Sequence, residues 1–228
     1  RQHIDVNIAN NKWAYLTSFT YSSFGDLRQG NKRSAAYPDF GKRFFYVARE
    51  NNTDVVKDNS ASVNIQKLSG YTQTDFLQKI LFKPNENTEH LLNVQISNSS
   101  DINRYDRLTE TSNGLPIFSE WYYGPQVRNM IGYKLTKSNL NGYFQKMTAN
   151  LNYQYLEESR ITRRFKSNNK DYRFEEVDLF GLNVDLLRQG KSSELHVGVE
   201  SYYNNVGSTA YRNNIASNVR SAITTRYS

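Results

Sequence analysis

The chain has 228 residues, a net charge of +7 from 29 Lys and Arg against 22 Asp and Glu, and no Cys. The absence of Cys excludes a disulfide framework and a thiolate metal site. The scattered basic residues accompany no recognised module or basic helix, which argues against nucleic-acid binding. Hydrophobic residues make up 37% and aromatic residues 14%, too aromatic for a disordered chain and too poor in aliphatic side chains for an ordinary globular core. No run of ~18 apolar residues is present, which excludes a transmembrane helix.

A hydrophobic period of two recurs along the chain and predicts β-strands. Leu151 and Tyr153, for example, alternate with the polar Asn152. Eight strands are expected, at about residues 2–9, 13–23, 71–83, 89–99, 125–136, 143–157, 174–187 and 194–204. No segment longer than two turns places apolar residues at helical spacing, so almost no helix is expected.

The connections between these strands are of two alternating kinds. Short polar turns are expected at residues 10–12, 84–89, 137–142 and 189–193. Long polar connections are expected at about 24–70, 100–123, 158–173 and 205–228. An antiparallel meander places every other connection at the same end, and one trimmed end with one elaborate end is typical of transmembrane barrels. Most strands also reach the ~9–11 residues that cross a bilayer, longer than the ~5–6 common in soluble proteins.

Aromatic residues cluster where the expected strands meet their connections. Trp121, Tyr122 and Tyr123 lie at a junction with a long connection, and Trp13 and Tyr143 lie beside short turns. Trp and Tyr prefer the boundary between lipid headgroups and acyl chains. These five residues are therefore predicted to form interface girdles, three at the long-loop end and two at the opposite end. The alternative is that they are core aromatics of a soluble β domain.

Six segments carry a resemblance to a known family: FTYSSFGDLRQGNKR (19–33), FGKRFFYV (40–47), SGYTQTDFLQKILFKPN (69–85), LLNVQISNSSDINRYDRLTE (91–110), EWYYGPQVR (120–128) and YQYLEESRITRRF (153–165). They resemble the barrel of TonB-dependent outer-membrane receptors of Bacteroidetes-type bacteria, in the haemoglobin or haem receptor-like subgroup. The resemblance covers about residues 3–200 in order.

The resemblance implies an antiparallel up-and-down transmembrane barrel of ~22 strands, of which residues 1–228 would supply about eight with their extracellular loops. A plug domain and the remaining strands would lie outside this chain, which starts in mid-strand without a Met and is interpreted as part of a longer protein. The implied partners are outer-membrane lipid, a TonB-type energy-coupling complex reached through the plug, and a possible surface lipoprotein. The implied cargo is haem or another iron complex, with no permanently bound cofactor and no nucleic-acid partner.

Two loop segments are candidates for contact with a ligand. Arg104, Tyr105, Asp106 and Arg107 lie in the second long connection beside the aromatic cluster; they form either a surface for ligand or plug, or a structural Arg–Asp pair that orders the loop. In the first long connection, three basic residues could meet an anionic group such as a propionate or catecholate, or could simply be solvated: Arg28, Lys32 and Arg33.

Two residues of the last predicted strand are candidate haem ligands. A neutral imidazole or a Tyr phenolate can ligate haem iron, and His196 and Tyr202 share the polar parity of that strand. The alternative is that both are ordinary lumen-lining residues. His90, beside a short turn, is a poorer candidate.

No enzymatic or metal site is expected. His196 and Glu200 stand about 13 Å apart along an extended strand, too far for a base and its orienting partner, and hydrolase, phosphate-loop and zinc motifs are lacking. The loop carboxylates match no calcium-loop spacing: Asp54, Asp58, Asp101, Asp106 and Glu110. The function alternatives are a soluble all-β ligand-binding module of the carbohydrate-binding kind and, less favoured, a barrel-resident hydrolase.

Overall fold

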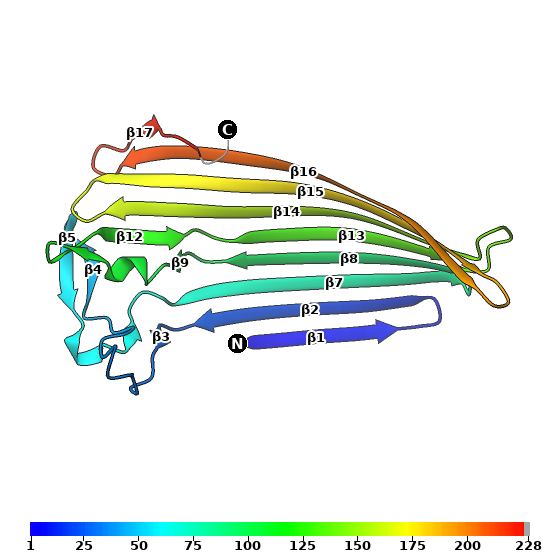
Figure 1. Ribbon diagram of the computed structural model, residues 1–228, viewed down its shortest axis with the longest axis horizontal. Helices are drawn as coiled ribbons and strands as arrows, with labels where there is room; N and C mark the ends of the chain where they lie inside the picture. Colours follow the sequence, from blue (N-terminus) through cyan, green and yellow to red (C-terminus); the bar gives the residue numbers. More distant parts are fainter. Residues whose placement is uncertain (226–228) are drawn as a thin grey trace.

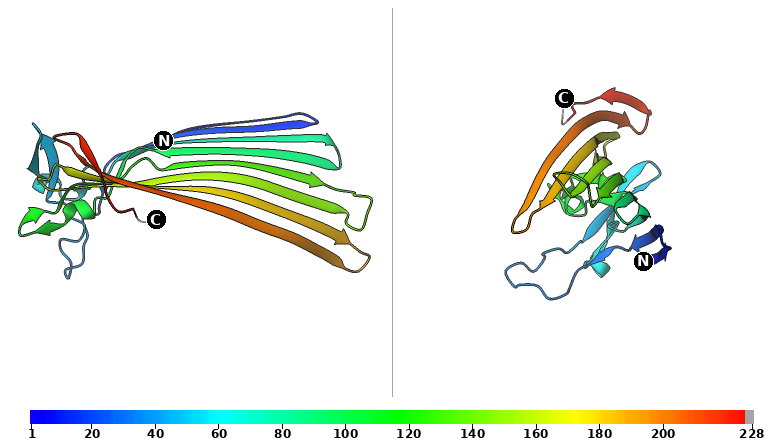
Figure 2. Two further views of the ribbon diagram at one scale, coloured as in Figure 1. Left: turned by 90° about the horizontal axis from the view of Figure 1, so that it is seen from above. Right: turned by 90° about the vertical axis from the view of Figure 1, so that its right-hand side faces the viewer.

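The computed structural model describes residues 1–225 and is all-β, with 67% of residues in strands and 3% in helix. Its main element is an antiparallel sheet in the order β1-β2-β7-β8-β13-β14-β15-β16-β17, with β12 paired to β14 and β9 paired to β12 (Figure 1). The strands of this sheet are β1 (Gln2–Ala9), β2 (Trp13–Phe24), β7 (Tyr71–Asn85), β8 (Thr88–Ser99), β9 (Ile102–Asn103), β12 (Phe118–Tyr123), β13 (Val127–Lys137), β14 (Lys146–Arg164), β15 (Asn169–Gln189), β16 (Glu194–Asn214) and β17 (Val219–Ala222). Figure 2 shows the sheet as one curved, twisted layer.

The predicted strand pattern is confirmed, and three strands are longer than expected. β14, β15 and β16 continue well past their predicted ends, so the long connections expected at 158–173 and 205–228 are wrong; residues 226–228 lie outside the described part of the chain. The extensions are held by cross-strand pairs: the rings of Tyr172 and Tyr211 stack 4.8 Å apart, and Arg212 binds Asp171 through two hydrogen bonds of 2.6 and 2.9 Å. The polar residues of these extensions led to the expectation of loops, but they alternate with aromatic residues, which favour strands.

The sheet does not close on itself within residues 1–225. β1 pairs only with β2, and β16 pairs with β15 along its whole length but with β17 only at Tyr211–Asn214. The all-β, antiparallel part of the predicted fold is therefore confirmed. No helix of the described residues is long and apolar enough to cross a membrane.

The two long connections that remain are ordered. The first, residues 25–70, holds two small sheets and a 3₁₀ turn: β3 (Leu27–Arg28), β6 (Ile65–Gln66), β4 (Phe45–Glu50), β5 (Thr53–Asp58) and η1 (Ser60–Ser62). Asn51 and Asn52, both at positive φ, make the tight turn between β4 and β5. The second, residues 100–126, holds η2 (Arg107–Thr109), β10 (Thr111–Ser112) and β11 (Leu115–Pro116) besides β9 and β12. Both lie at the left-hand end in Figure 1, which we call the loop end.

The two faces of the sheet differ in chemistry because the pairing register places the apolar residues of neighbouring strands opposite one another, on the same face. One continuous row, for example, runs Tyr15–Ile80–Leu92–Tyr133–Leu151–Leu182 from β2 to β15. We call the side that carries this row the apolar face. The polar face carries Asn93, Gly132, Asn152 and Gly181 between the same strands.

The apolar face forms a band of limited height. On β14 it extends from Met147 to Tyr155, which at ~3.3 Å per residue is about 26 Å. Many of its side chains are solvent-exposed in the described structure: Leu151 is 52% exposed and Val197 43%. The four buried hydrophobic residues of the described chain all lie at the loop end instead: Val47, Leu108, Trp121 and Ile161.

Candidate functional site at the loop end

A bulge between β12 and β13 determines how the loop end is built. Tyr123 pairs with Arg160 of β14, whereas Val127 pairs with Glu157, so one strand has an extra residue over this stretch. The break falls at Gly124, where a Cβ would meet Ser159 Oγ at 2.2 Å. An extra residue of this kind exchanges the faces to which the side chains point.

The aromatic triplet is therefore divided between the two faces. Trp121 pairs with Thr162 and Tyr123 with Arg160, which places both rings on the polar face; Trp121 is also only 7% exposed. Only Tyr122 keeps the parity of the apolar face. This placement of Trp121 and Tyr123 does not favour the predicted girdle role, whose contact with lipid stays a prediction for all three residues.

Arg104 joins the polar-face rings into one cluster. Its guanidinium lies 4.9 Å from the Trp121 ring centroid, donates to Tyr123 Oη at 3.3 Å and binds Asp106 at 3.1 Å. The hydrogen bond with Asp106 raises the pKa of Arg104 above its ordinary value. Trp121 and Tyr123 meet edge to face at 5.1 Å. We call Arg104, Asp106, Trp121 and Tyr123 the Arg104 cluster.

The rest of the predicted second-loop site is split. Arg107 pairs with Glu110 at 2.6 Å on the exposed side of η2, and Tyr105 is half-buried without entering the Arg104 cluster. The buried Leu108 anchors the turn. One of the two expectations for this loop was a structural Arg–Asp pair, and Arg104 and Asp106 form such a pair. The same guanidinium also contacts Trp121 and Tyr123.

A second cluster at the loop end is a buried ion network. Glu120, Arg163 and Lys170 face one another in a single row across β12, β14 and β15. Arg163 binds Asp54 of β5 through two hydrogen bonds of 2.8 Å and Glu120 through Nε at 2.5 Å, and Glu120 also pairs with Lys170. The side chains of Arg163 and Asp54 are 1% and 0% exposed. The network therefore clamps the first long loop onto the strand wall.

The electrostatics of the network keep its members charged. Burial alone would raise the pKa of Asp54, but hydrogen bonds from Arg163, from Ser119 Oγ at 2.5 Å and from the Lys166 amide at 2.7 Å lower it to about 2. Burial acts against the charge of Lys170, and its hydrogen bond with Glu120 outweighs burial and raises the pKa.

Polar side chains also order the inside of the first loop. The Arg43 side chain, 1% exposed, donates to the carbonyls of Phe45 and Lys67 at 3.1 and 2.5 Å, and burial lowers its pKa to about 10 although Asp26 opposes the shift. Asn59 Nδ2 donates to the Arg43 carbonyl at 2.8 Å and to two others of the loop. Buried polar groups of this kind need such partners, so the loop is a small ordered body.

A cavity of about 310 Å³ lies between the clamped loop and the sheet. Val47, Ala48, Leu68 and Leu108 give the cavity apolar walls, and Arg49 of the loop and Glu120 and Arg163 of the sheet give it charged ones. Asp101 also lines it, and burial raises the pKa of this carboxyl although Lys170 opposes the shift.

The basic candidates of the first loop do not converge on one point. Arg28 is exposed on β3 and Lys32 is exposed beyond it. Arg33 is engaged with its own loop, donating from Nε to the Phe40 carbonyl at 2.8 Å and from Nη2 to Asn64 Oδ1 at 2.5 Å. None of the three lies in the Arg104 cluster.

The candidate haem ligands are separated along one strand. His196 and Tyr202 both lie on the polar face of β16, six residues and therefore about 20 Å apart. His196 is bonded to Glu194. They cannot contribute to one compact site, and neither reaches the Arg104 cluster at the far end of the strand. His90 lies on the apolar face, with Nδ1 2.7 Å from Tyr133 Oη.

Two of the predicted girdle residues lie where an apolar band would end. Trp13 belongs to the apolar face beside a short turn and stacks on Phe82 at 4.2 Å. Tyr143 lies in the turn between β13 and β14, 61% exposed, with the Arg188 guanidinium 3.7 Å from its ring centroid. Their contact with lipid stays a prediction.

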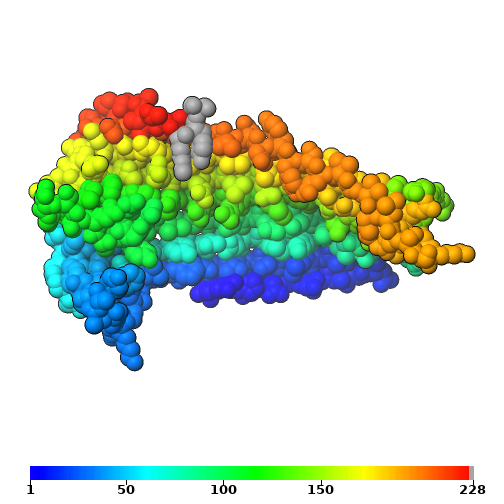
Figure 3. Space-filling view, in the orientation of Figure 1, coloured from blue at the N-terminus to red at the C-terminus, as the bar shows by residue number. Residues whose placement is uncertain are grey.

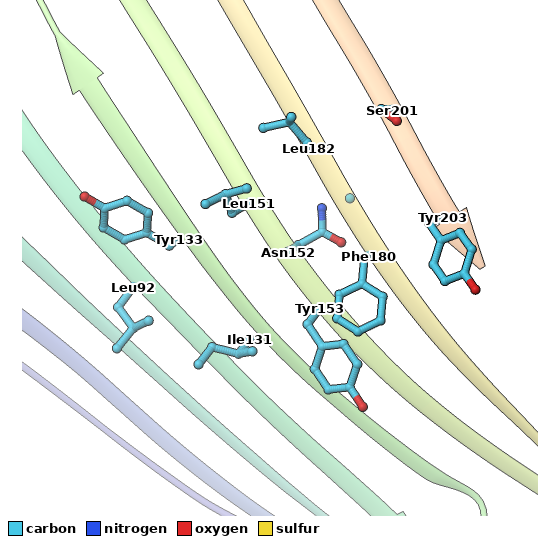
Figure 4. A pocket seen from close by; sticks show the side chains of 11 residues that line it. Leu92, Ile131, Tyr133, Leu151, Asn152, Tyr153, Phe180, Leu182, Ser201 and Tyr203 are labelled. Atoms are coloured by element: carbon cyan, nitrogen blue, oxygen red, sulfur yellow. The ribbon is translucent and has the colours of Figure 1, made fainter. Parts of the chain in front are cut away.

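A larger hollow, about 500 Å³, opens within the apolar band. Figure 4 shows Tyr153 and Phe180 side by side in it, with Leu92 and Ile131 on neighbouring strands. Its lining residues include Asn152, Ser201 and three Tyr but no charged residue. The charged and aromatic side chains that could orient a ligand converge at the loop end instead, so the site is better placed there.

Sequence reasoning missed the ion network. Asp54 was considered only as a possible calcium ligand with Asp58, whose carboxylate instead accepts from Ser60 Oγ at 2.5 Å. Arg163 occurs in the sequence analysis only within the segment YQYLEESRITRRF. The two partners are 109 residues apart in the chain, and no local pattern links them. Within residues 1–225 no three His, Asp or Glu side chains gather closely enough to hold a metal ion.

Comparisons with known proteins do not place the chain. No family model matches it, and neither curated proteins nor solved structures give a match.

Proposed function

We propose that the chain is a wall and loop segment of a transmembrane β-barrel in a bacterial outer membrane. The observation that carries this proposal is the exposed apolar band, about 26 Å high, on long strands whose other face is polar. An outward apolar band of ~25 Å with a polar interior is the pattern of such barrels. The confinement of the elaborate connections to one end supports the same assignment.

The barrel is proposed to belong to a TonB-dependent receptor that imports a scarce nutrient, with haem or another iron complex as the nutrient class. This part rests on the sequence resemblance. The Arg104 cluster supplies a fitting contact: a guanidinium and two aromatic rings at the loop end of the polar face. The Arg104 guanidinium, whose side chain is 35% exposed, can hold a carboxylate of an anionic ligand, and the half-buried Tyr123 ring lies beside it. Capture by the loops would precede transport, and no covalent chemistry is required.

The second candidate is a soluble all-β binding module. It is favoured by the ordered loop end, which has buried side chains like a small soluble protein. It is disfavoured by the apolar band, because a soluble sandwich packs such a face against a second sheet ~10 Å away, whereas Leu151 is 52% exposed here.

Membrane extraction separates the two candidates. The receptor proposal predicts that the full-length protein stays with outer membranes after an alkaline carbonate wash and needs detergent to leave them. Release by the wash, followed by monodisperse behaviour in buffer, would overturn it. Growth on haem as the sole iron source then tests the nutrient: a strain with the Arg104→Ala variant should grow more slowly than one with the Arg107→Ala control, and equal growth on haem would reject the cluster as its contact.

A further inference from the structure

The first loop presents two aromatic rings that no part of the described structure covers. Tyr37 is 70% exposed and Phe40 is 75% exposed, the highest values among the large hydrophobic side chains of residues 1–225. Both lie in residues 29–42, which we call the finger. Figure 3 shows this blue segment projecting from the loop end of the molecule. The other large apolar side chains that are more than 60% exposed lie on sheet strands or, for Tyr143, in a turn at the opposite end of the molecule, so the finger is a separate feature.

The finger is an ordered projection. The Tyr37 amide donates to the Ser34 carbonyl at 3.0 Å and the Phe40 amide to the Tyr37 carbonyl at 3.2 Å, which gives successive turns. Arg33 bridges the tip to the base through the Phe40 carbonyl and Asn64. The backbone that carries the two rings is therefore ordered before a partner covers them, which reduces the conformational entropy lost on binding.

The charge around the rings is positive. The finger contains three basic residues, Lys32, Arg33 and Lys42, and one acidic residue, Asp39. Asp39 pairs with Lys42 at 2.9 Å. Lys32 has no ion-pair partner among residues 1–225, and neither has Arg28 at the base.

We propose that the finger is a docking surface for an acidic protein. Tyr37 and Phe40 would enter apolar depressions on that partner, and its carboxylates would face Lys32 and Arg28. Aromatic residues and Arg are enriched at the centres of protein interfaces, and complementary charge speeds encounter and fixes orientation. Two rings of ~150–250 Å² each fit the small, transient class of interface. The inference does not depend on whether the sheet lies in lipid.

The test uses the full-length protein in detergent and a soluble random copolymer of glutamate and tyrosine as the acidic probe. The parent chain should bind this copolymer, and Lys32→Glu or the double change Tyr37→Ser with Phe40→Ser should each weaken binding about tenfold, as expected when an interface anchor is lost. Lys191→Glu makes the same charge change at the opposite end of the molecule, and Leu115→Ser removes an exposed apolar side chain, 51% exposed, from the second loop. Both controls should bind like the parent.

Any of four results would overturn the proposal. The parent chain could fail to bind the acidic copolymer, or could bind a lysine–tyrosine copolymer as well. The finger variants could bind like their controls. The finger variants could also lose binding to vesicles that contain phosphatidylglycerol while keeping the copolymer, which would assign the finger to anionic lipid instead. Unchanged circular dichroism of each variant shows that a loss of binding does not reflect unfolding.

Discussion

The loop end and the strand wall of this molecule obtain their stability in different ways. At the loop end, Trp121 and Ile161 are buried and the Arg163–Asp54 pair is sealed from solvent, so this part contains its own core. Along the wall, Leu151 and Val197 remain exposed on a single-layered sheet. A sheet with an uncovered apolar face needs an apolar environment supplied from outside. The difference teaches that the loop end buries its own core, whereas the strand wall has no second layer to cover its apolar face.

The largest expected effect is at the ion network of the loop end. Arg163→Met removes the cation that Asp54 and Glu120 share, and breaking a buried pair by removing one partner costs about 3–5 kcal/mol. The first loop should detach, and the amides of β4 and β5 should exchange with deuterium much faster. Arg164→Met, at the exposed neighbouring position, should leave exchange unchanged. Equal protection in both variants would show that the loop does not depend on the clamp.

The next effect distinguishes the two faces of the wall. Leu151→Arg puts a charge in the middle of the apolar band and should cost about 2–4 kcal/mol of membrane stability, as at a bilayer midplane. Asn152→Arg makes the same addition on the polar face and should cost far less. Denaturant titration of the protein folded into phospholipid vesicles measures both. Similar losses for the two variants would remove the distinction between the faces.

The clamp should also depend on pH in a defined direction. The pKa of Asp54 is lowered from 3.8 to about 2, so its contribution is complete above pH ~4 and is lost as pH falls towards 2, by roughly 2 kcal/mol. The pKa of Lys170 is raised from 10.5, so its contribution is complete below that value and is lost at higher pH. A spin label at Val56, on β5, should stay immobile at pH 5 and 8 and gain mobility near pH 2.5. Mobility that increases already at pH 5 would contradict this assignment.

The smallest effect is at the exposed side of the loop end. Arg104→Ala removes a cation–π contact worth about 0.5–1 kcal/mol and should change the fluorescence of Trp121, read in a Trp13→Phe background. Arg107→Ala, whose pair with Glu110 lies on the surface, should leave the spectrum unchanged. An identical spectrum for Arg104→Ala would place the guanidinium elsewhere in solution.

The strand wall was largely predictable from the sequence, and the loop end was not. Alternation such as Leu151, Asn152, Tyr153 reports directly which face a side chain takes, because strand geometry has a period of two. The face of the sheet on which Trp121 lies depends on a one-residue bulge at Gly124, and the sequence pattern on either side does not reveal this bulge. The Asp54–Arg163 pair depends on how a loop folds back over 109 residues.

The central claim is that the apolar face of the wall contacts lipid and the polar face contacts water. Single cysteines with an environment-sensitive fluorophore, placed in the full-length protein in membranes that contain a lipid-attached quencher, test this most directly. The sites form neighbouring pairs, one on each face: Leu92 and Asn93, Leu151 and Asn152, Leu182 and Asn183, Val199 and Glu200. The account predicts strong quenching at the first member of every pair and little at the second. Equal quenching within the pairs, or none at all, would contradict it.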